Sequence, residues 1–285
     1  MPDESPRPPA RQPFTFGGVA RFAHASVSRL ILTSLFFGLV TGLAVSWLAT
    51  RFWAPVIDEA VAALPPNSSI QGGTLRWPER SGRLLAANHH LSFEVLLRDS
   101  PTESASVDLA FEFQPDRLGL RSVLGSASVP YPDHSTFKLN RTALVPTWGA
   151  WRAPALFALV PATALLLLLG WSLLAIPYAF LTRAIAAIFR RELNFRTAWK
   201  LSVAAQLPGS ILMIFAIGLY ATGQVSILFI VVMFVAHFIP TLLYLLVSPI
   251  LAPKKSRVAS DRDNPFESER APRNRGKNPF ANRHH

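Results

Sequence analysis

The chain has 285 residues, of which 50% are hydrophobic and 16% are charged, and its formal net charge at pH 7 is +11. The charged fraction lies below the ~25% of a soluble domain, so the composition favours a membrane protein. Cysteine is absent, which excludes disulfide bonds, a thiolate nucleophile and a cysteine-ligated metal.

The N-terminal part, residues 1–28, opens with a polar stretch rich in proline, and we expect a disordered and interfacial cytoplasmic segment. An apolar run from Leu30 to Thr50 follows, with an arginine on either side. About 20 apolar residues cross a bilayer as a helix, so residues 29–51 are predicted to form transmembrane helix 1. A cleaved signal peptide is the alternative, but its apolar core is about 7–15 residues long, which is shorter than this run.

Residues 52–152 differ from the apolar runs, because apolar and polar residues alternate in short stretches between turn-forming residues. Such alternation is typical of half-buried strands, and it predicts a small β-rich extracytoplasmic domain of roughly five strands. One alternating set has an apolar face at Val107, Leu109, Phe111 and Phe113 and another face at Asp108, Ala110 and Glu112. A second set shares an apolar face at Leu85, Ala87, Leu91, Phe93, Val95 and Leu97. The register of the second set places His89 on its apolar side.

A second apolar run predicts transmembrane helix 2 at residues 153–182, and a basic cytoplasmic connector follows at residues 183–200. Asn194 can cap a helix that continues into the next apolar run. We expect four cations of the connector to contact anionic lipid headgroups: Arg190, Arg191, Arg196 and Lys200. Because Arg196 and Lys200 are four residues apart, they would lie on one side of that helix.

Between Leu201 and Pro253 the chain has no charged residue, and this run is too long for a single crossing. The small and polar residues 221–224 favour a reversal, which predicts transmembrane helix 3 at residues 201–221 and transmembrane helix 4 at residues 225–248. Backbone amides in a bilayer must be bonded internally, so runs this apolar are expected to be helices. The last segment, residues 253–285, is predicted to be a disordered, basic cytoplasmic tail.

The positive charges are unevenly distributed. Lysine plus arginine against aspartate plus glutamate number 4 against 2 before helix 1, 10 against 10 between helices 1 and 2, 5 against 1 in the connector and 9 against 4 in the tail. The excess therefore lies in segments that share one side of a four-span protein, and the positive-inside rule makes that side cytoplasmic. We predict a multi-pass protein of the cell (inner or plasma) membrane with both termini in the cytoplasm. Topology and anionic headgroups account for the charge, so no nucleic-acid partner is predicted.

Two polar residues inside the apolar runs are candidates for a functional role in the membrane. His237 is the one His, Asp, Glu, Lys or Arg within the predicted helices 2 to 4, and Gln206 lies in predicted helix 3. Such residues are rare in membranes and often functional, which favours a proton or substrate path. A structural role is the alternative, because His237 can bond a neighbouring helix or a carbonyl that Pro240 leaves free.

His89, His90 and Glu94 are residue types that ligate metals. On a strand, however, His90 and Glu94 would lie ~13 Å apart. A single ion with bonds of ~2 Å cannot join them, so we predict no metal site. Nucleotide-binding, phosphate-loop and metalloprotease motifs are absent, and the sequence therefore predicts no cofactor, no catalytic residue and no enzyme.

A short motif occurs twice in the tail, as Asn264, Pro265 and Phe266 and again as Asn278, Pro279 and Phe280. Asn-Pro favours a turn, which would present the phenylalanine to a partner. Both copies resemble the peptides that endocytic EH domains bind, so they are candidate docking peptides. A chance occurrence in a tail rich in proline and asparagine is the alternative.

The segment from Asn194 to Ser202, followed by Leu207, Pro208 and Gly209, resembles the start of the third span in a bacterial family of four-span membrane proteins. Members of that family have an extracytoplasmic insert between spans one and two. The family has no assigned activity, so the resemblance implies the topology and supplies neither a substrate nor catalytic residues.

The predicted fold class is therefore an α-helical membrane protein with four transmembrane helices and a small β-rich extracytoplasmic domain. We expect a non-enzymatic envelope protein with a sensing, scaffolding or accessory role, whose outer domain binds a protein or envelope partner. A transporter or channel subunit with His237 in the membrane path is the first alternative. A membrane enzyme that acts on lipid or envelope polymer is the second, with His89, His90 and Glu94 as its candidates.

Overall fold

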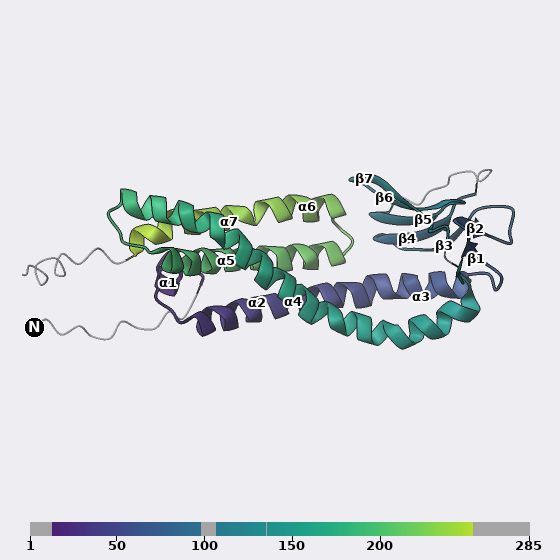
Figure 1. The fold of residues 1–285 in the computed structure, drawn as a ribbon, viewed down its shortest axis with the longest axis horizontal. Helices are drawn as coiled ribbons and strands as arrows, with labels where there is room; N and C mark the ends of the chain where they lie inside the picture. The colour runs from purple at the N-terminus through teal and green to yellow at the C-terminus, as the bar shows by residue number, and fades with distance from the viewer. Residues whose placement is uncertain (1–12, 98–106, 135, 253–285) are drawn as a thin grey trace, which may run out of the picture.

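The computed structural model describes residues 13–97, 107–134 and 136–252. The molecule is elongated, with long helices side by side along its length and a β-rich region at one end (Figure 1). Four helices in the described part are long and apolar enough to cross a membrane, by length and composition. The prediction of a mainly helical protein with a small β-sheet region is confirmed.

The first long helix consists of α2 (Val27–Leu48), a π-helical turn η1 (Ala49–Trp53) and α3 (Ala54–Ala63), and the short α1 (Phe16–Phe22) precedes it. Pro55 stands at the start of α3. Because proline lacks an N–H and its ring crowds the preceding turn, the wider π turn lets the helix continue past it. The helix therefore extends beyond residue 51, the predicted end of transmembrane helix 1, into the β-rich end of the molecule.

The second long helix is α4 (Arg141–Ile188), which exceeds the predicted residues 153–182 at both ends. Asn140 begins it as an N-cap, because its side-chain oxygen accepts a hydrogen bond of 2.9 Å from the backbone N–H of Ala143. The first turns of α4 consequently lie beside α3 and the strands rather than among the other long helices (Figure 1).

Two kinds of contact join α4 to the first long helix. At the β-rich end, Trp148 Nε1 donates to Asp58 Oδ1 at 2.6 Å, and Arg152 Nη1 lies 3.1 Å from Asp58 Oδ2. Further along, α2 and α4 approach so closely at Gly42 that a Cβ there would lie 2.5 Å from the carbonyl oxygen of Val160. Small residues permit such close packing between apolar helices.

The remaining helices are α5 (Phe195–Ala221), α6 (Ile227–Ala236), α7 (Phe238–Val247) and the 3₁₀ turn η2 (Ser248–Leu251). The predicted cap of α5 is confirmed, because Asn194 Oδ1 accepts from Thr197 N at 2.8 Å. The break between α6 and α7 lies at His237. It follows from Pro240, which has no N–H to donate to the carbonyl of Ala236.

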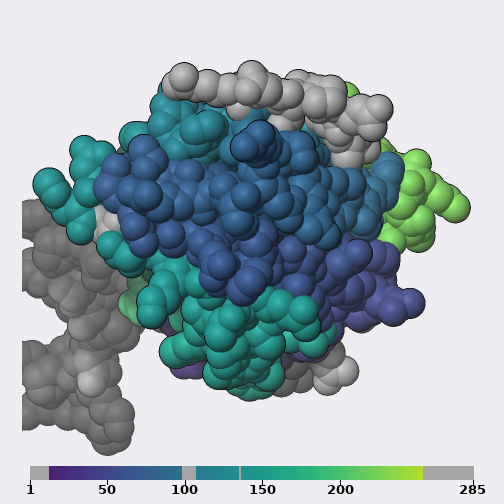
Figure 2. Space-filling model, turned by 90° about the vertical axis from the view of Figure 1, so that its right-hand side faces the viewer, coloured from purple at the N-terminus to yellow at the C-terminus, as the bar shows by residue number. Residues whose placement is uncertain are grey.

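The β-rich region contains eight strands in the described residues, more than the roughly five that alternation predicts. A small sheet of order β2-β1-β8 consists of β1 (Ser69–Gln71), β2 (Thr74–Arg76) and β8 (Thr136–Phe137). A larger sheet of order β3-β4-β5-β6-β7 consists of β3 (Arg83–Ala87), β4 (Leu91–Val95), β5 (Leu109–Phe113), β6 (Arg117–Ser122) and β7 (Gly125–Pro130). Adjacent strands of this larger sheet are antiparallel, except for β4 and β5, which are parallel. Figure 2 faces this end and shows the strands (blue) beside the start of α4 (teal).

The larger sheet carries charged residues on a buried face. Apolar residues of β4 pack in one core with Val56 and Ala60 of α3. The predicted alternation of β5 is present, but its polar face is not solvated, since Glu112 is 8% exposed and Glu94 of β4 is 2% exposed. Arg121 explains this burial, because its Nε lies 2.6 Å from Glu112 Oε1 and its Nη2 lies 3.8 Å from Glu94 Oε1.

Candidate functional site

The candidate site lies where the larger sheet meets the turn between α5 and α6. Asn88 shapes the link from β3 to β4, because its side-chain oxygen accepts hydrogen bonds of 2.9 Å from the backbone N–H groups of both His90 and Leu91. Its amide nitrogen donates to the carbonyl oxygen of Phe52 at 2.7 Å, which ties the link to the first long helix. This local turn places His89 and His90 at the end of the sheet that faces the helices.

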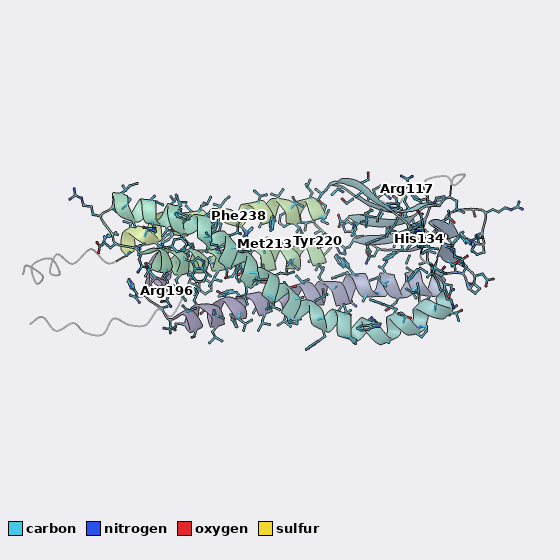
Figure 3. All side chains as sticks on the ribbon, in the orientation of Figure 1. Arg117, His134, Arg196, Met213, Tyr220 and Phe238 are labelled. Atoms are coloured by element: carbon cyan, nitrogen blue, oxygen red, sulfur yellow. The ribbon has the colours of Figure 1, made fainter. Side chains whose placement is uncertain are left out.

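His90 is buried among aromatic side chains at this junction. It is 3% exposed, its ring centroid lies 5.2 Å from that of Phe52, and it lies 4.4 Å from that of Tyr220 at the end of α5. Figure 3 shows Tyr220 at the end of the helices nearest the strands. The imidazole therefore connects three parts of the chain that are distant in sequence.

Asp108 lies next to His90 because β4 and β5 are parallel. The backbone N–H of Asp108 donates to the carbonyl of His89 at 3.3 Å, and that of Leu109 donates to the carbonyl of His90 at 3.2 Å. Asp108 is 4% exposed, and its Oδ1 accepts a 3.0 Å hydrogen bond from the backbone N–H of Ile227, the first residue of α6. A carboxylate at this position is favoured by the free N–H groups and the dipole of the helix N-terminus.

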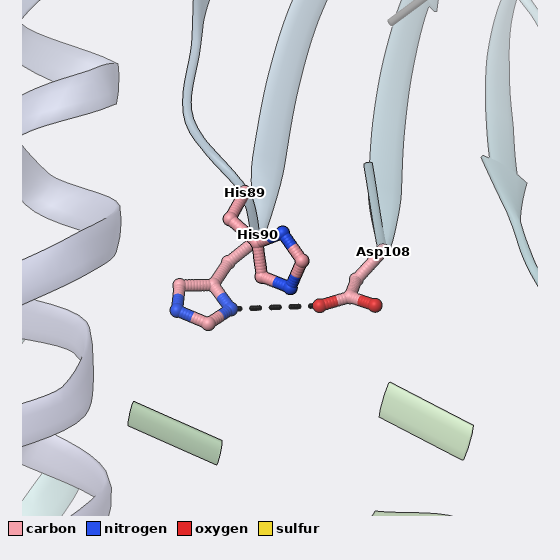
Figure 4. Close-up of side chains that lie close together, drawn as sticks. All are labelled: His89, His90 and Asp108. Carbon is pink, nitrogen blue, oxygen red and sulfur yellow. Dashed lines mark ion pairs between the residues drawn. The ribbon is translucent and has the colours of Figure 1, made fainter. Parts of the chain in front are cut away.

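The second oxygen of Asp108 faces the imidazole. Oδ2 and His90 Nδ1 form a buried ion pair at 3.5 Å (Figure 4), longer than an ordinary hydrogen bond, and the side chain of Tyr220 also interacts with Asp108. Burial lowers the pKa of His90; the nearby Asp108 opposes this effect and the charge of His89 adds to it. A lowered pKa favours the neutral imidazole, which offers a nitrogen lone pair to a ligand or to a proton donor.

The structure keeps His89 and His90 together, separates Glu94 from them and adds Asp108. The apolar alternation predicted from Leu85 to Leu97 is interrupted between β3 and β4, so His89 is exposed and His90 is buried, the reverse of the predicted facing. Glu94 lies away from both histidines and accepts a hydrogen bond of 2.8 Å from Ser92 Oγ. Asp108 takes its place, and no local spacing signals this, because the two strands pair through a non-local contact.

The two polar residues predicted within the membrane are bonded to backbone. Gln206 is buried, and its Nε2 donates to the carbonyls of Trp171 at 3.0 Å and Ser202 at 3.2 Å. His237 Nδ1 is hydrogen-bonded to the carbonyl of Phe234, one turn earlier in α6. Gln206 thus links two helices, whereas the carbonyl that His237 bonds lies in its own helix and is not the one that Pro240 leaves free; a functional role for either residue stays a prediction.

The four cations of the connector differ in their surroundings. Arg190 and Arg196 are exposed, and Arg196 lies at the end of the helices opposite the strands (Figure 3). Arg191 lines an open groove together with His24 and Arg183. Lys200 departs from the prediction that it shares a headgroup-facing side with Arg196, because it is 8% exposed and its Nζ donates to the carbonyl of Ala25 at 2.7 Å. The contact with the link between α1 and α2 turns the ammonium inward.

The two Asn-Pro-Phe motifs lie outside the described residues, as does the whole predicted tail. Comparisons with family models, with curated proteins and with solved structures found no match to this chain. The resemblance to the four-span bacterial family therefore stays a prediction.

Proposed function

We propose that the chain is a non-enzymatic protein of the cell membrane, with both termini in the cytoplasm and the β-rich region outside. In this proposal the outer region binds a ligand or envelope partner and passes the event to the helices as a sensing or accessory protein. The four apolar helices and the distribution of positive charge support the placement. Arg190, Arg191 and Arg196 then face anionic headgroups on the cytoplasmic side.

One observation carries the sensing role, namely the hydrogen bond of 3.0 Å between Asp108 and the backbone N–H of Ile227. It joins the first residue of α6 to the residue that precedes β5, so a change in the position of β5 alters the N-terminus of the apolar segment Ile227–Leu251, which is long enough to cross a membrane. The packing of His90 between Phe52 and Tyr220 adds a second connection at the same place. Coupling of this kind requires an element whose arrangement both sites influence.

A transport path has less support than sensing. In the two residues that such a path would use, Gln206 Nε2 and His237 Nδ1 are bonded to backbone carbonyls. Flux assays in proteoliposomes separate the two functions. Under the sensing proposal, His237→Ala and Gln206→Ala leave solute and proton flux at the background of empty vesicles, as does the unmodified chain. Flux that these substitutions abolish would instead establish the transporter.

Two experiments test the proposal directly. Reporter enzymes inserted at Gly119 and after His285 should report from opposite compartments, with Gly119 outside; a cytosolic Gly119 overturns the placement. Hydrogen exchange on the full chain tests the coupling, because Asp108→Ala removes one hydrogen bond worth about 1 kcal/mol and should speed exchange in the first turn of α6 about fivefold. Asp116→Ala, in an exposed ion pair with Arg117, is the matched control and should leave α6 unchanged.

A further inference from the structure

We propose that His89, His90 and Asp108 together bind one divalent transition-metal ion of the Zn²⁺ class at the junction. The sequence alone predicts no metal, because it pairs His90 with Glu94, whereas the fold supplies Asp108 instead. The inference rests on the proposed function in one respect, since it names the ligand that the outer region would sense. No other group of three His, Asp or Glu residues in the described part of the chain forms a comparable cluster.

The spacing of the three side chains fits a single ion. One ligand atom from each of His89, His90 and Asp108 lies within 4.8 Å of the others. Ligands at about 2.0–2.2 Å from a tetrahedral Zn²⁺ are about 3.3–3.6 Å apart, and His90 Nδ1 and Asp108 Oδ2 are already 3.5 Å apart. His89 is exposed and lies at the edge of the site, so its ring can turn to complete the set (Figure 4).

The weak link between two of these atoms is a second observation. Buried nitrogens and oxygens are nearly always hydrogen-bonded, yet His90 Nδ1 and Asp108 Oδ2 are joined only by an ion pair at 3.5 Å, longer than an ordinary hydrogen bond (Figure 4). Their side chains are 3% and 5% exposed. An ion between them would satisfy both atoms at once, since each offers a lone pair and neither needs to carry a proton.

The surroundings hold the ligands in position. Asp108 Oδ1 is fixed by the N–H of Ile227, and His90 is held between the rings of Phe52 and Tyr220. Groups of this kind orient ligands and tune the affinity of metal sites. Two imidazoles and one carboxylate suit Zn²⁺, Co²⁺ or Ni²⁺, while Ca²⁺ and Mg²⁺ prefer oxygen ligands throughout. Three protein ligands leave a fourth position for water or for a group from a partner.

The test uses the full chain in lipid nanodiscs, purified without a histidine tag and stripped of metal with a chelator. Zn²⁺ alone is then titrated by calorimetry, and Co²⁺ alone is followed by its visible absorption. We expect one equivalent per chain, tetrahedral Co²⁺ bands, and no competition from millimolar Ca²⁺ or Mg²⁺. His89→Ala and Asp108→Asn should each weaken binding at least tenfold, as for lost contacts in other metal sites.

The variants are chosen so that the fold survives. His89 is exposed, and Asp108→Asn keeps a side-chain oxygen that can accept from Ile227. His134→Ala is the matched control, because His134 is exposed and lies in the β-rich region away from the junction (Figure 3). Equal Zn²⁺ binding by the unmodified chain and by the His89→Ala, Asp108→Asn double variant overturns the site. Loss of binding in His134→Ala alone also overturns it.

Metal binding and the proposed function can fail separately. The nanodisc exposes both sides of the membrane, so the titration reports the site regardless of orientation. A bound ion together with a cytosolic Gly119 reporter would overturn the outer placement and leave the metal site in place. An outer Gly119 reporter without Zn²⁺ binding would retain the sensor and refute its metal ligand.

Discussion

The helical half and the β-rich half of the molecule accommodate buried polar side chains in different ways. Among the helices, Gln206 and Lys200 each donate to the backbone carbonyl of another helix or segment. In the larger sheet, the buried carboxylates of Glu94 and Glu112 instead face the partly exposed guanidinium of Arg121. A neutral side chain such as the Gln206 amide needs no counter-charge and carries a smaller desolvation cost than an ion, whereas the carboxylates of the sheet require the cation of Arg121.

His90 and Asp108 can be compared with a buried polar pair among the helices. In the helical half, Thr182 and Ser202 bond each other at 3.1 Å, so this buried hydroxyl pair is satisfied. His90 and Asp108 are equally buried but are joined only by an ion pair at 3.5 Å. Other buried atoms, among them Ser34 Oγ and Ser248 Oγ in the helices, also lack a hydrogen-bond partner, so the distinguishing feature of His90 and Asp108 is that their two atoms face each other beside His89.

The largest expected effect comes from breaking the charge cluster of the sheet. Arg121→Ala leaves the carboxylates of Glu94 and Glu112 buried without their cation, and should reduce the stability of β4 to β6 by about 2–4 kcal/mol. The partial exposure of Arg121, 34% of its side chain, moderates the loss. Amide hydrogen exchange across these strands, on the full chain in detergent, measures the change.

Arg117→Ala is the control for this prediction. Arg117 also pairs with a carboxylate, that of Asp116, but both side chains are about half exposed at 47% and 58%. Its removal should leave hydrogen exchange in β4 to β6 close to that of the unmodified chain, because surface ion pairs contribute little to stability. Equal losses in the two variants would show that the buried cluster is not held by Arg121.

A smaller effect is expected in the helical half. Gln206→Leu removes the hydrogen bonds to the carbonyls of Trp171 and Ser202 while keeping a side chain of similar volume. Hydrogen bonds between membrane helices are worth about 0.6–1.7 kcal/mol, so unfolding in sodium dodecyl sulfate should shift by an amount in this range. Gln224→Leu, at the exposed turn, should leave the unfolding curve unchanged. A shift of the same size in both variants would contradict the linking role of Gln206.

The sequence predicts the features that depend on neighbours along the chain. Uninterrupted apolar runs predict the four long helices, and Asn194 predicts where α5 begins, which its bond to Thr197 confirms. The turn at Gly223 lies within residues 221–224, where the reversal was expected, and its φ of +72° suits glycine. Each of these features is set within a few residues.

Features that depend on distant contacts were not predictable from the pattern. Lys200 is turned inward by the carbonyl of Ala25, which is 175 residues away in the chain. Asp108 reaches His90 only because β4 and β5 pair in parallel, and parallel pairing has no signature in hydrophobic alternation. The same alternation placed Glu112 on the polar face of a half-buried strand. It carries no information about Arg121, which lies on the neighbouring strand and allows Glu112 to be buried.

The smallest change in stability at neutral pH is expected from a substitution of Tyr131 in the β-rich half. At high pH the same residue should make the stability depend on pH. Burial, reinforced by the negative charge of Asp116, raises the pKa of Tyr131 to about 12. Because the raised pKa favours the neutral phenol in the folded chain, its contribution to stability is complete below pH ~10 and is lost as the pH rises toward 12. Tyr131→Phe, which keeps the ring and removes the hydroxyl, should be nearly neutral at pH 7 and should lessen the loss of stability between pH 10 and 12. The absorbance of tyrosinate near 295 nm, followed against pH in the unmodified chain and in Tyr131→Phe, measures this ionisation. If Tyr131→Phe removes a component that titrates near pH 10 and none near pH 12, the phenol is solvated and this face of the region is open to water.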